Sequence, residues 1–166
     1  MRIRPYMESK DFNEIKNWIT EERAHAMWCE NIIRFPVEKE NFAKVLREAA
    51  ERFGDRPYVA VSEDERLIGF FCFHVNPETG EGMLKFVMIS PECRGKGVGK
   101  EMLKLAVKHA FEMTDAQAVQ LNVFPENVRA MRCYEAVGFK ARKTTPGAFV
   151  YKDESWGRCN MVITKE

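Results

Sequence analysis

The sequence has 166 residues, of which 45% are hydrophobic and 31% are charged, and its formal net charge is +1. This composition is typical of a globular protein, and the length predicts one domain over residues 1–166. A net charge this small excludes a broad basic field. We therefore expect neither nucleic acid nor a membrane surface as a partner, and any affinity for anions must be local.

The sequence has an odd number of cysteines, five, and no two of them form a C-x-x-C pair. These features argue against a zinc site and against a disulfide framework, so no metal is expected. The N-terminal residues carry charges and lack the apolar segment of a signal peptide. We therefore expect a cytoplasmic protein with reduced thiols.

Hydrophobic periodicity divides the chain into short apolar strands and amphipathic helices. Residues 20–35 fit either a further helix or a loop. The order strand–helix–strand–helix in the second half predicts a parallel crossover, and the hairpin before it predicts antiparallel neighbours. We therefore predict an α/β chain with a mixed sheet and helices on both faces. In chain order the patterns predict a strand at 2–6, a helix capped by Ser9 or Asp11, a helix from Pro36 to Phe53, strands at 58–61, 67–75 and 83–89, a helix at 97–111, a strand at 118–124, a helix at 127–137, and strands at 139–145 and 156–163.

A glycine-rich basic loop joins the predicted strand at 83–89 to the helix that follows it. Glycines let main-chain N–H groups approach a ligand, and a helix N-terminus attracts anions. Arg94, Lys96 and Lys100 add positive charge to the same place. The loop is therefore a candidate phosphate site, although an ordinary tight turn between a strand and a helix is the alternative.

Two common nucleotide-binding motifs do not fit this loop. Three residues separate Gly95 from Gly99, one fewer than in a P-loop, and Glu101 stands where a P-loop has Ser or Thr. The alternating glycines also differ from the G-x-G-x-x-G of dinucleotide-binding folds. The pattern that fits is R-x-x-G-x-G, formed by Arg94, Gly97 and Gly99.

That pattern resembles the acetyl-CoA loop of the GNAT N-acetyltransferases. A second segment, N-x-x-A-x-x-x-Y-E-x-x-G-F over residues 127–139, resembles the second signature of the same family. Together the two segments cover about a third of the chain, from Met83 to Phe139. The resemblance implies a GNAT fold, a mostly antiparallel sheet in which one parallel pair is splayed at the acetyl-CoA site.

The resemblance also implies how acetyl-CoA would be held as the acyl donor. The pantetheine arm would pair like an added strand with the main chain of Val87 and Ile89. The main chain near Met88 would polarise the thioester carbonyl. The diphosphate would lie on the main-chain N–H groups of the loop. The residues expected there are Arg94, Gly95, Lys96, Gly97, Val98, Gly99 and Lys100.

Two side chains of the second signature have both a functional and a structural interpretation. Tyr134 matches the family's general acid, which protonates the departing CoA sulfur, but a buried tyrosine on an apolar helix face would look the same. Asn127 matches a contact to the coenzyme arm, and asparagine is also a good helix N-cap. Both interpretations remain open for each residue.

The general base and the acceptor site are less well defined. Asn122 stands where one branch of the family has a carboxylate, so the base remains open among Glu30, His74, Glu78, Glu81 and Glu126. In the family the acceptor site comes mostly from the first helices and the last strands. Aromatic side chains in those segments could line an amine pocket or belong to the core. These are Trp28, Phe149, Tyr151 and Trp156.

The resemblance implies acetyl transfer to a primary amine of a small molecule or peptide, in a ternary complex. Two alternatives are a non-catalytic module that senses acyl-CoA and a transferase for a longer acyl group. Homodimers are common in the family, so a homodimer is a further expectation.

Overall fold

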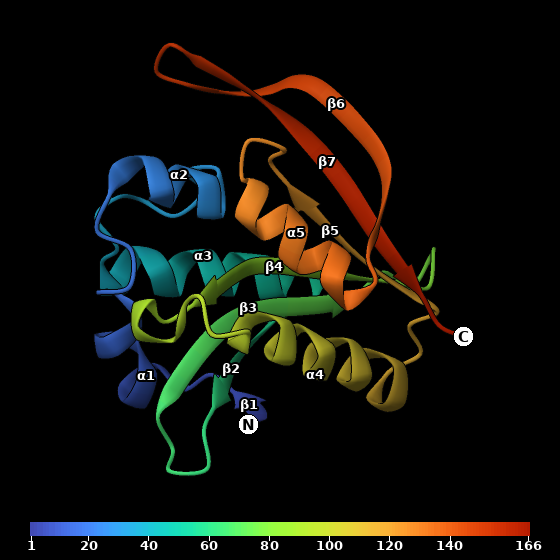
Figure 1. Cartoon of the computed structure of the whole chain (residues 1–166). Coiled ribbons are helices and arrows are strands. Elements are labelled where there is room, and N and C mark those ends of the chain that lie inside the picture. The colour runs from blue at the N-terminus through green and yellow to red at the C-terminus, as the bar shows by residue number, and fades with distance from the viewer.

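The computed structural model describes all residues from 1 to 166 (Figure 1). None of its helices is both long enough and apolar enough to cross a bilayer. The helices are α1 (Glu8–Ile15), α2 (Glu22–Cys29), α3 (Lys39–Phe53), α4 (Val98–Met113) and α5 (Val128–Val137), with a 3-10 turn η1 (Pro91–Cys93). The strands are β1 (Arg2–Pro5), β2 (Arg56–Val61), β3 (Leu67–Val75), β4 (Glu81–Ile89), β5 (Ala118–Val123), β6 (Lys140–Tyr151) and β7 (Glu154–Thr164).

The strands form one seven-stranded sheet in the order β1-β2-β3-β4-β5-β7-β6. Every neighbouring pair is antiparallel except β4 and β5, which are parallel and are joined through α4. The predicted mixed sheet with one parallel crossover is therefore confirmed. β1 lies at an edge, where Pro5 interrupts no central ladder.

Helices cover both faces of the sheet, as predicted, and each face has its own core. On one face, α4 and α5 bury Leu103, Ala106 and Tyr134 against β3, β4 and β5. On the other face, α1 and α3 bury Phe12 and Phe42 with the opposite side chains of β2 and β3. Figure 1 shows α4 and α5 in front of the strands and α3 behind them. The sheet thus separates two layers, and a passage between them requires a gap in the sheet.

The larger differences from the sequence predictions concern the ends of elements. The N-cap of α1 is Met7 instead of Ser9 or Asp11; the Asp11 carboxylate accepts the Met7 N–H from inside the helix, at 2.8 Å. Of the two possibilities left open for residues 20–35, the structure shows a helix, α2. Pro36 precedes α3, which begins at Lys39. The last hairpin is longer than predicted because a register shift between Thr145 and Phe149 keeps both strands paired past a proline and a glycine.

A bulge in β4 lies at the point where the strand approaches the glycine-rich loop. Lys85 pairs with Cys72 and Met88 with Phe70, so Phe86 and Val87 together face one residue of β3. Phe86 has a φ of 52°, which is a left-handed conformation rare for an aromatic residue. A bulge bends its strand and strengthens the local twist, so β4 changes direction at this residue.

Candidate active site at the fork between β4 and β5

The two parallel strands pair over only a short length before they diverge. Three pairs join them: Glu81 with Ala118, Gly82 with Val119, and Met83 with Gln120. After Met83 and Gln120 the two strands no longer pair with each other. We call this point of divergence the fork.

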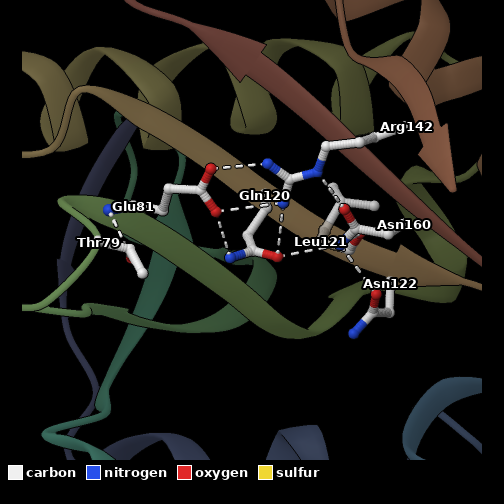
Figure 2. A network of polar contacts seen from close by, with 7 residues as sticks. All are labelled: Thr79, Glu81, Gln120, Leu121, Asn122, Arg142 and Asn160. Atoms are coloured by element: carbon white, nitrogen blue, oxygen red, sulfur yellow. Dashed lines mark hydrogen bonds and ion pairs between the residues drawn. The ribbon is translucent and has the colours of Figure 1, made fainter.

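A network of polar side chains closes the paired end of the fork (Figure 2). Arg142 of β6 donates to both carboxylate oxygens of Glu81, at 2.6 and 3.1 Å, and Gln120 donates to the same carboxylate at 2.7 Å. The hydrogen bonds to Arg142 hold the pKa of Glu81 below its usual value. Strands β4, β5 and β6 are therefore tied together where the parallel pairing begins.

The same network continues toward the open end of the fork. Asn160 of β7 accepts a hydrogen bond from Arg142 Nε at 2.8 Å and donates to the side chains of Gln120 and Asn122, each at 3.0 Å. In Figure 2 these side chains form a chain that ends at Asn122. Asn122 is therefore held by its neighbours on the sheet and lies on the wall of the cavity described next.

A cavity of about 600 Å³ occupies the fork, and we call it the fork cavity. Its wall includes β4 from Met83 to Ile89 and β5 from Leu121 to Phe124. Helix α3 contributes Val45, Ala49 and Phe53, so the cavity extends to the α3 face of the sheet. Because both diverging strands line it, the cavity lies in the sheet gap that the family resemblance implies.

A second cavity, of about 950 Å³, lies over the glycine-rich loop on the opposite side, and we call it the loop cavity. It is lined by the start of α4, by α5 and by the segment between α1 and α2. The two cavities have several wall residues in common, so they adjoin at the fork. The shared residues are Ile19, Met27, Val87, Ile89, Arg94, Asn127, Ala130 and Tyr134.

The glycine-rich loop provides the floor of the loop cavity. Gly95 and Gly97 have φ values of 78° and 76°, a left-handed conformation that glycine adopts without steric cost. Gly97 is the N-cap of α4, so the first N–H groups of that helix lie at the cavity. Gly95, Gly97, Gly99 and Lys100 line the cavity, whereas Lys96 and Val98 are not part of its wall.

Arg94 lines both cavities, but the main chain already engages its guanidinium. Its Nε donates to the carbonyl of Ile89 at 3.2 Å, and Nη2 donates to the carbonyl of Trp18 at 3.3 Å. Burial and the nearby Arg129 lower the pKa of Arg94. In this structure Arg94 therefore ties the loop to the end of β4 and to the segment after α1.

Two arginines that the sequence analysis missed also line the loop cavity. Arg129 and Arg132 are exposed side chains three residues apart on α5. A Cβ atom added to Gly95 would lie 3.8 Å from Arg129 Nη2, so this guanidinium is beside the loop. Their spacing after the helix N-cap was a usable signal, because residues three apart share a helix face. They bring positive charge to a cavity suited to a phosphorylated ligand.

Tyr134 lies where the two cavities adjoin. Its side chain is 8% exposed and packs edge-on against Phe139. Its hydroxyl has no hydrogen-bond partner within the protein, yet it is not among the fully enclosed polar atoms. Burial, with a smaller contribution from Cys133, raises the pKa of Tyr134. The hydroxyl is therefore protonated at neutral pH and free to donate a proton or hydrogen bond to a ligand.

Asn127 is the N-cap of α5 and also faces both cavities. Its side-chain oxygen accepts the Ala130 N–H at 3.3 Å, which makes it the N-cap of α5. It also lines both cavities. The cap uses one lone pair of the oxygen, so the amide nitrogen remains available to a ligand.

Of the four aromatic residues expected near an acceptor, only Trp28 is part of the fork-cavity wall. Phe149, Tyr151 and Trp156 lie behind it. Phe149 and Trp156 pack on Phe124, which does line the cavity. The reason is that the last hairpin turns its aromatic side chains toward Ala26 of α2 and forms a separate small core.

The structure places the candidate bases in different surroundings. Only Glu30 lines the fork cavity. Glu81 belongs to the polar network, and Glu126 accepts the N–H of Gly157 at 3.0 Å. His74 hydrogen-bonds to Asp55. Two carboxylates that the sequence analysis did not consider, Glu48 and Asp55, line the cavity as well. No group of three or more metal-ligating side chains is arranged to hold a metal ion.

Comparison with known proteins agrees with this geometry. The chain is 32% identical to the spermine/spermidine N(1)-acetyltransferase of Bacillus subtilis (strain 168) over 80 residues, which are 45% of this chain and 53% of that protein. It is 35% identical to the mycothiol acetyltransferase of Rhodococcus jostii (strain RHA1) over 85 residues, 49% of this chain and 28% of that protein. The matched part thus spans about half, or less, of these curated relatives.

Among solved structures, the spermidine N-acetyltransferase from Vibrio cholerae, in complex with CoA and spermine, superposes with a TM-score of 0.81. The superposition covers 98% of this chain and 94% of that chain at 20% identity, so the likeness is one of fold. The model of the acetyltransferase (GNAT) family matches residues 12–139, which include the fork, the loop and α5. Because this match covers well over half of the sequence, the chain belongs to the GNAT acetyltransferase family.

Proposed function

We propose that the protein is an N-acetyltransferase that moves an acetyl group from acetyl-CoA to a primary amine in a ternary complex. In this proposal the coenzyme lies in the loop cavity with its arm entering the fork, and the acceptor lies in the fork cavity. One observation carries the proposal: the unpartnered hydroxyl of Tyr134 lies where the two cavities adjoin. Donor and acceptor would meet at this proton donor.

The loop cavity has features suited to a coenzyme A ligand. Left-handed glycines and the N-terminus of α4 would bring main-chain N–H groups to a diphosphate. Lys100, Arg129 and Arg132 would add charge around it. Beyond the fork the main chain of β4 lacks a partner strand on the β5 side, so an extended arm with two amides can pair there.

The proposed reaction has three proton transfers. The ammonium of the acceptor first loses a proton, and the neutral nitrogen then attacks the thioester carbonyl. The C–S bond breaks, Tyr134 protonates the departing sulfur, and the second proton that the nitrogen loses as the amide forms restores the tyrosine. An N–H group near Met88 would stabilise the oxyanion that forms between these steps. An alkyl amine of pKa near 10.4 must first lose its proton, at a cost of about 4.6 kcal/mol at pH 7. Of the five candidate bases from the sequence, only Glu30 is on the cavity wall, and it could accept that proton directly or through water.

The relatives share one type of reaction, acetyl transfer, but differ in the acceptor. By their names, the relatives given above are a spermine/spermidine N(1)-acetyltransferase and a mycothiol acetyltransferase, and another relative is an aminoglycoside N(6')-acetyltransferase from Klebsiella pneumoniae. Polyamines and aminoglycosides both offer amines, so a primary amine is the common element. Polyamines, aminoglycosides, amino acids and peptide amines are the classes to test first.

The direct test measures CoA release with acetyl-CoA and a panel of these amines. We expect saturable acetyl-CoA binding by calorimetry and release of CoA that depends on the amine. Binding without release for any amine would favour an acyl-CoA sensor instead. Faster release from propionyl- or succinyl-CoA than from acetyl-CoA would favour a transferase for a longer acyl group.

A further inference from the structure

The charges on the fork-cavity wall balance one another. Three carboxylates line it, and so do three cations. Nineteen of its 27 wall residues are hydrophobic, among them Trp28, Phe86 and Phe124. An acceptor that carries several ammonium groups would need carboxylates that are free to pair with them. The charged wall residues are Glu30, Glu48, Asp55, Arg52, Lys85 and Arg94.

Asp55 is not free, because the protein's own ammonium group occupies its site. Lys85 Nζ lies 2.8 Å from Asp55 Oδ2 and 4.0 Å from the centroid of the Phe53 ring. His74 engages the other carboxylate oxygen. A carboxylate beside an aromatic face is a favourable site for an alkylammonium ion. Here Lys85 fills that site from within the chain.

Glu30 is engaged in a similar way. Arg158 of β7 donates from Nη2 to both oxygens of Glu30, at 2.9 and 3.0 Å, and from Nε at 3.3 Å. Glu48 is different, since its side chain is 60% exposed and its contact with Lys44 is long, at 3.8 Å. A surface ion pair of this kind contributes little to stability. Both carboxylates away from the exposed rim are therefore already paired with cations of the protein.

We propose that the acceptor is a small monoamine with an apolar or aromatic body, and that Arg158 and Lys85 disfavour acceptors with a second ammonium group. This inference rests on the proposed function, because it assigns the acceptor class for the same cavity. The apolar wall accommodates the body of the acceptor. A second ammonium in the enclosed part of the cavity, away from Glu48 at the exposed rim, would be removed from water without a free carboxylate to receive it. The B. subtilis relative is named for polyamines, so the proposal separates this chain from that relative.

Two amines of equal chain length give the sharpest test: hexylamine and 1,6-diaminohexane differ at one end by a second ammonium group. Steady-state kinetics with acetyl-CoA should give a kcat/KM for hexylamine at least about tenfold above that for 1,6-diaminohexane, counted per amine group. We expect phenethylamine to be as good a substrate as hexylamine, and spermidine to be as poor a substrate as 1,6-diaminohexane.

The variant Arg158→Gln tests the assignment of Arg158. It leaves the Glu30 carboxylate without its cation, so the ratio of kcat/KM for 1,6-diaminohexane to kcat/KM for hexylamine should rise about tenfold, whatever the variant does to the rate that both amines share. The matched control is Arg23→Gln. Arg23 also joins α2 to the last hairpin, through Glu154 at 2.9 Å, but it lies outside the cavity wall. The control should leave the preference unchanged.

The possible outcomes separate this inference from the proposed function. Turnover that favours 1,6-diaminohexane or spermidine over hexylamine would overturn the acceptor class and leave N-acetyl transfer intact. An unchanged preference in Arg158→Gln would overturn the role of Arg158. Absence of turnover with every amine, while acetyl-CoA still binds, would overturn the proposed function and the acceptor class with it.

Discussion

The two ends of the fork differ in how their polar groups are satisfied. At the closed end, Glu81, Gln120 and Arg142 bond to one another across three strands. At the open end, β4 has no partner on its β5 side, and the hydroxyl of Tyr134 has no partner within the protein. The fork therefore has one end at which the polar groups are satisfied and one at which they are not.

This difference shows how one pair of strands can serve both stability and binding. Unpaired polar groups are costly unless water or a ligand completes them, so they are expected where a ligand binds. The closed end holds the strands at a defined separation, and the bulge at Phe86 lies in the part of β4 that no longer pairs with β5. We therefore expect substitutions at the open end to impair turnover and substitutions at the closed end to impair stability.

The largest effect is expected from Tyr134→Phe at the open end. Loss of the proton donor should lower kcat by at least about 100-fold, while the Kd for acetyl-CoA changes little. The free energy of unfolding should stay within about 1 kcal/mol of the parent, because the hydroxyl has no protein hydrogen bond to lose. Timed assays of CoA release measure kcat, calorimetry measures the Kd, and urea unfolding measures the free energy of unfolding. A variant with full turnover would show that Tyr134 is only a core residue.

A smaller effect is expected from Gly97→Ala in the loop. A Cβ atom there meets no atom within 4 Å, but φ is 76°, so alanine is strained by about 1 kcal/mol. We expect the Kd for acetyl-CoA to rise about tenfold, because relaxing this strain displaces the N–H groups at the start of α4.

Gly54→Ala is the matched control for the loop variant. Gly54 ends α3 with a φ of 77° and also has open space around its Cα. Both variants should lose a similar amount of unfolding free energy, and only Gly97→Ala should weaken binding. Equal affinities in the two variants would mean that the loop does not hold the coenzyme.

At the closed end, Arg142→Met should reduce stability by about 1 kcal/mol, which corresponds to a fall in Tm of about 3 °C. The estimate is small because the Arg142 side chain is 40% exposed and that of Glu81 is 24% exposed. The Kd for acetyl-CoA should not change. Differential scanning fluorimetry and calorimetry test both statements, and a large loss of affinity would show that the two ends are coupled.

The smallest effect is the pH dependence of that stability difference. Arg142 lowers the pKa of Glu81 below its ordinary value of 4.5, so the ionised carboxylate stabilises the folded state. This contribution is complete above about pH 4.5 and is lost as the pH falls through the lower folded pKa. The difference in unfolding free energy between parent and Arg142→Met should therefore be constant from pH 7 to 5 and shrink below pH 4.5. Urea titrations at four pH values would measure it, and a difference that grew in acid would contradict it.

Local patterns predicted most of the fold. The alternating strands, the glycine-rich loop and the signature around Tyr134 depend on residues close together in sequence, so periodicity and spacing predicted their positions. The boundaries that differed had tertiary causes. Asp11 acts from inside α1, and its carboxylate bonds to Arg4 of a separate strand as well as to Met7. No local signal distinguishes this arrangement from an N-cap.

The wall of the site was less predictable because it depends on register and on distant contacts. Glu30 meets Arg158 only because α2 lies beside the last hairpin, and 128 positions separate them. The Phe86 bulge changes which β4 side chains face the cavity, and a hydrophobic run does not reveal a bulge. Likewise Asp55, His74 and Lys85 come from three places in the chain, so their contacts appear only in the fold.

The separation of the two cavities has a kinetic consequence for the proposed reaction. Helix α3 contributes to the wall of the fork cavity alone, and Gly95, Gly97, Gly99 and Lys100 contribute to that of the loop cavity alone. In the proposed arrangement each reactant has its own cavity, so neither product must wait for the other to depart. Product-inhibition patterns should accordingly be competitive between CoA and acetyl-CoA, and between the acetylated and free amine, with no competition across the two pairs.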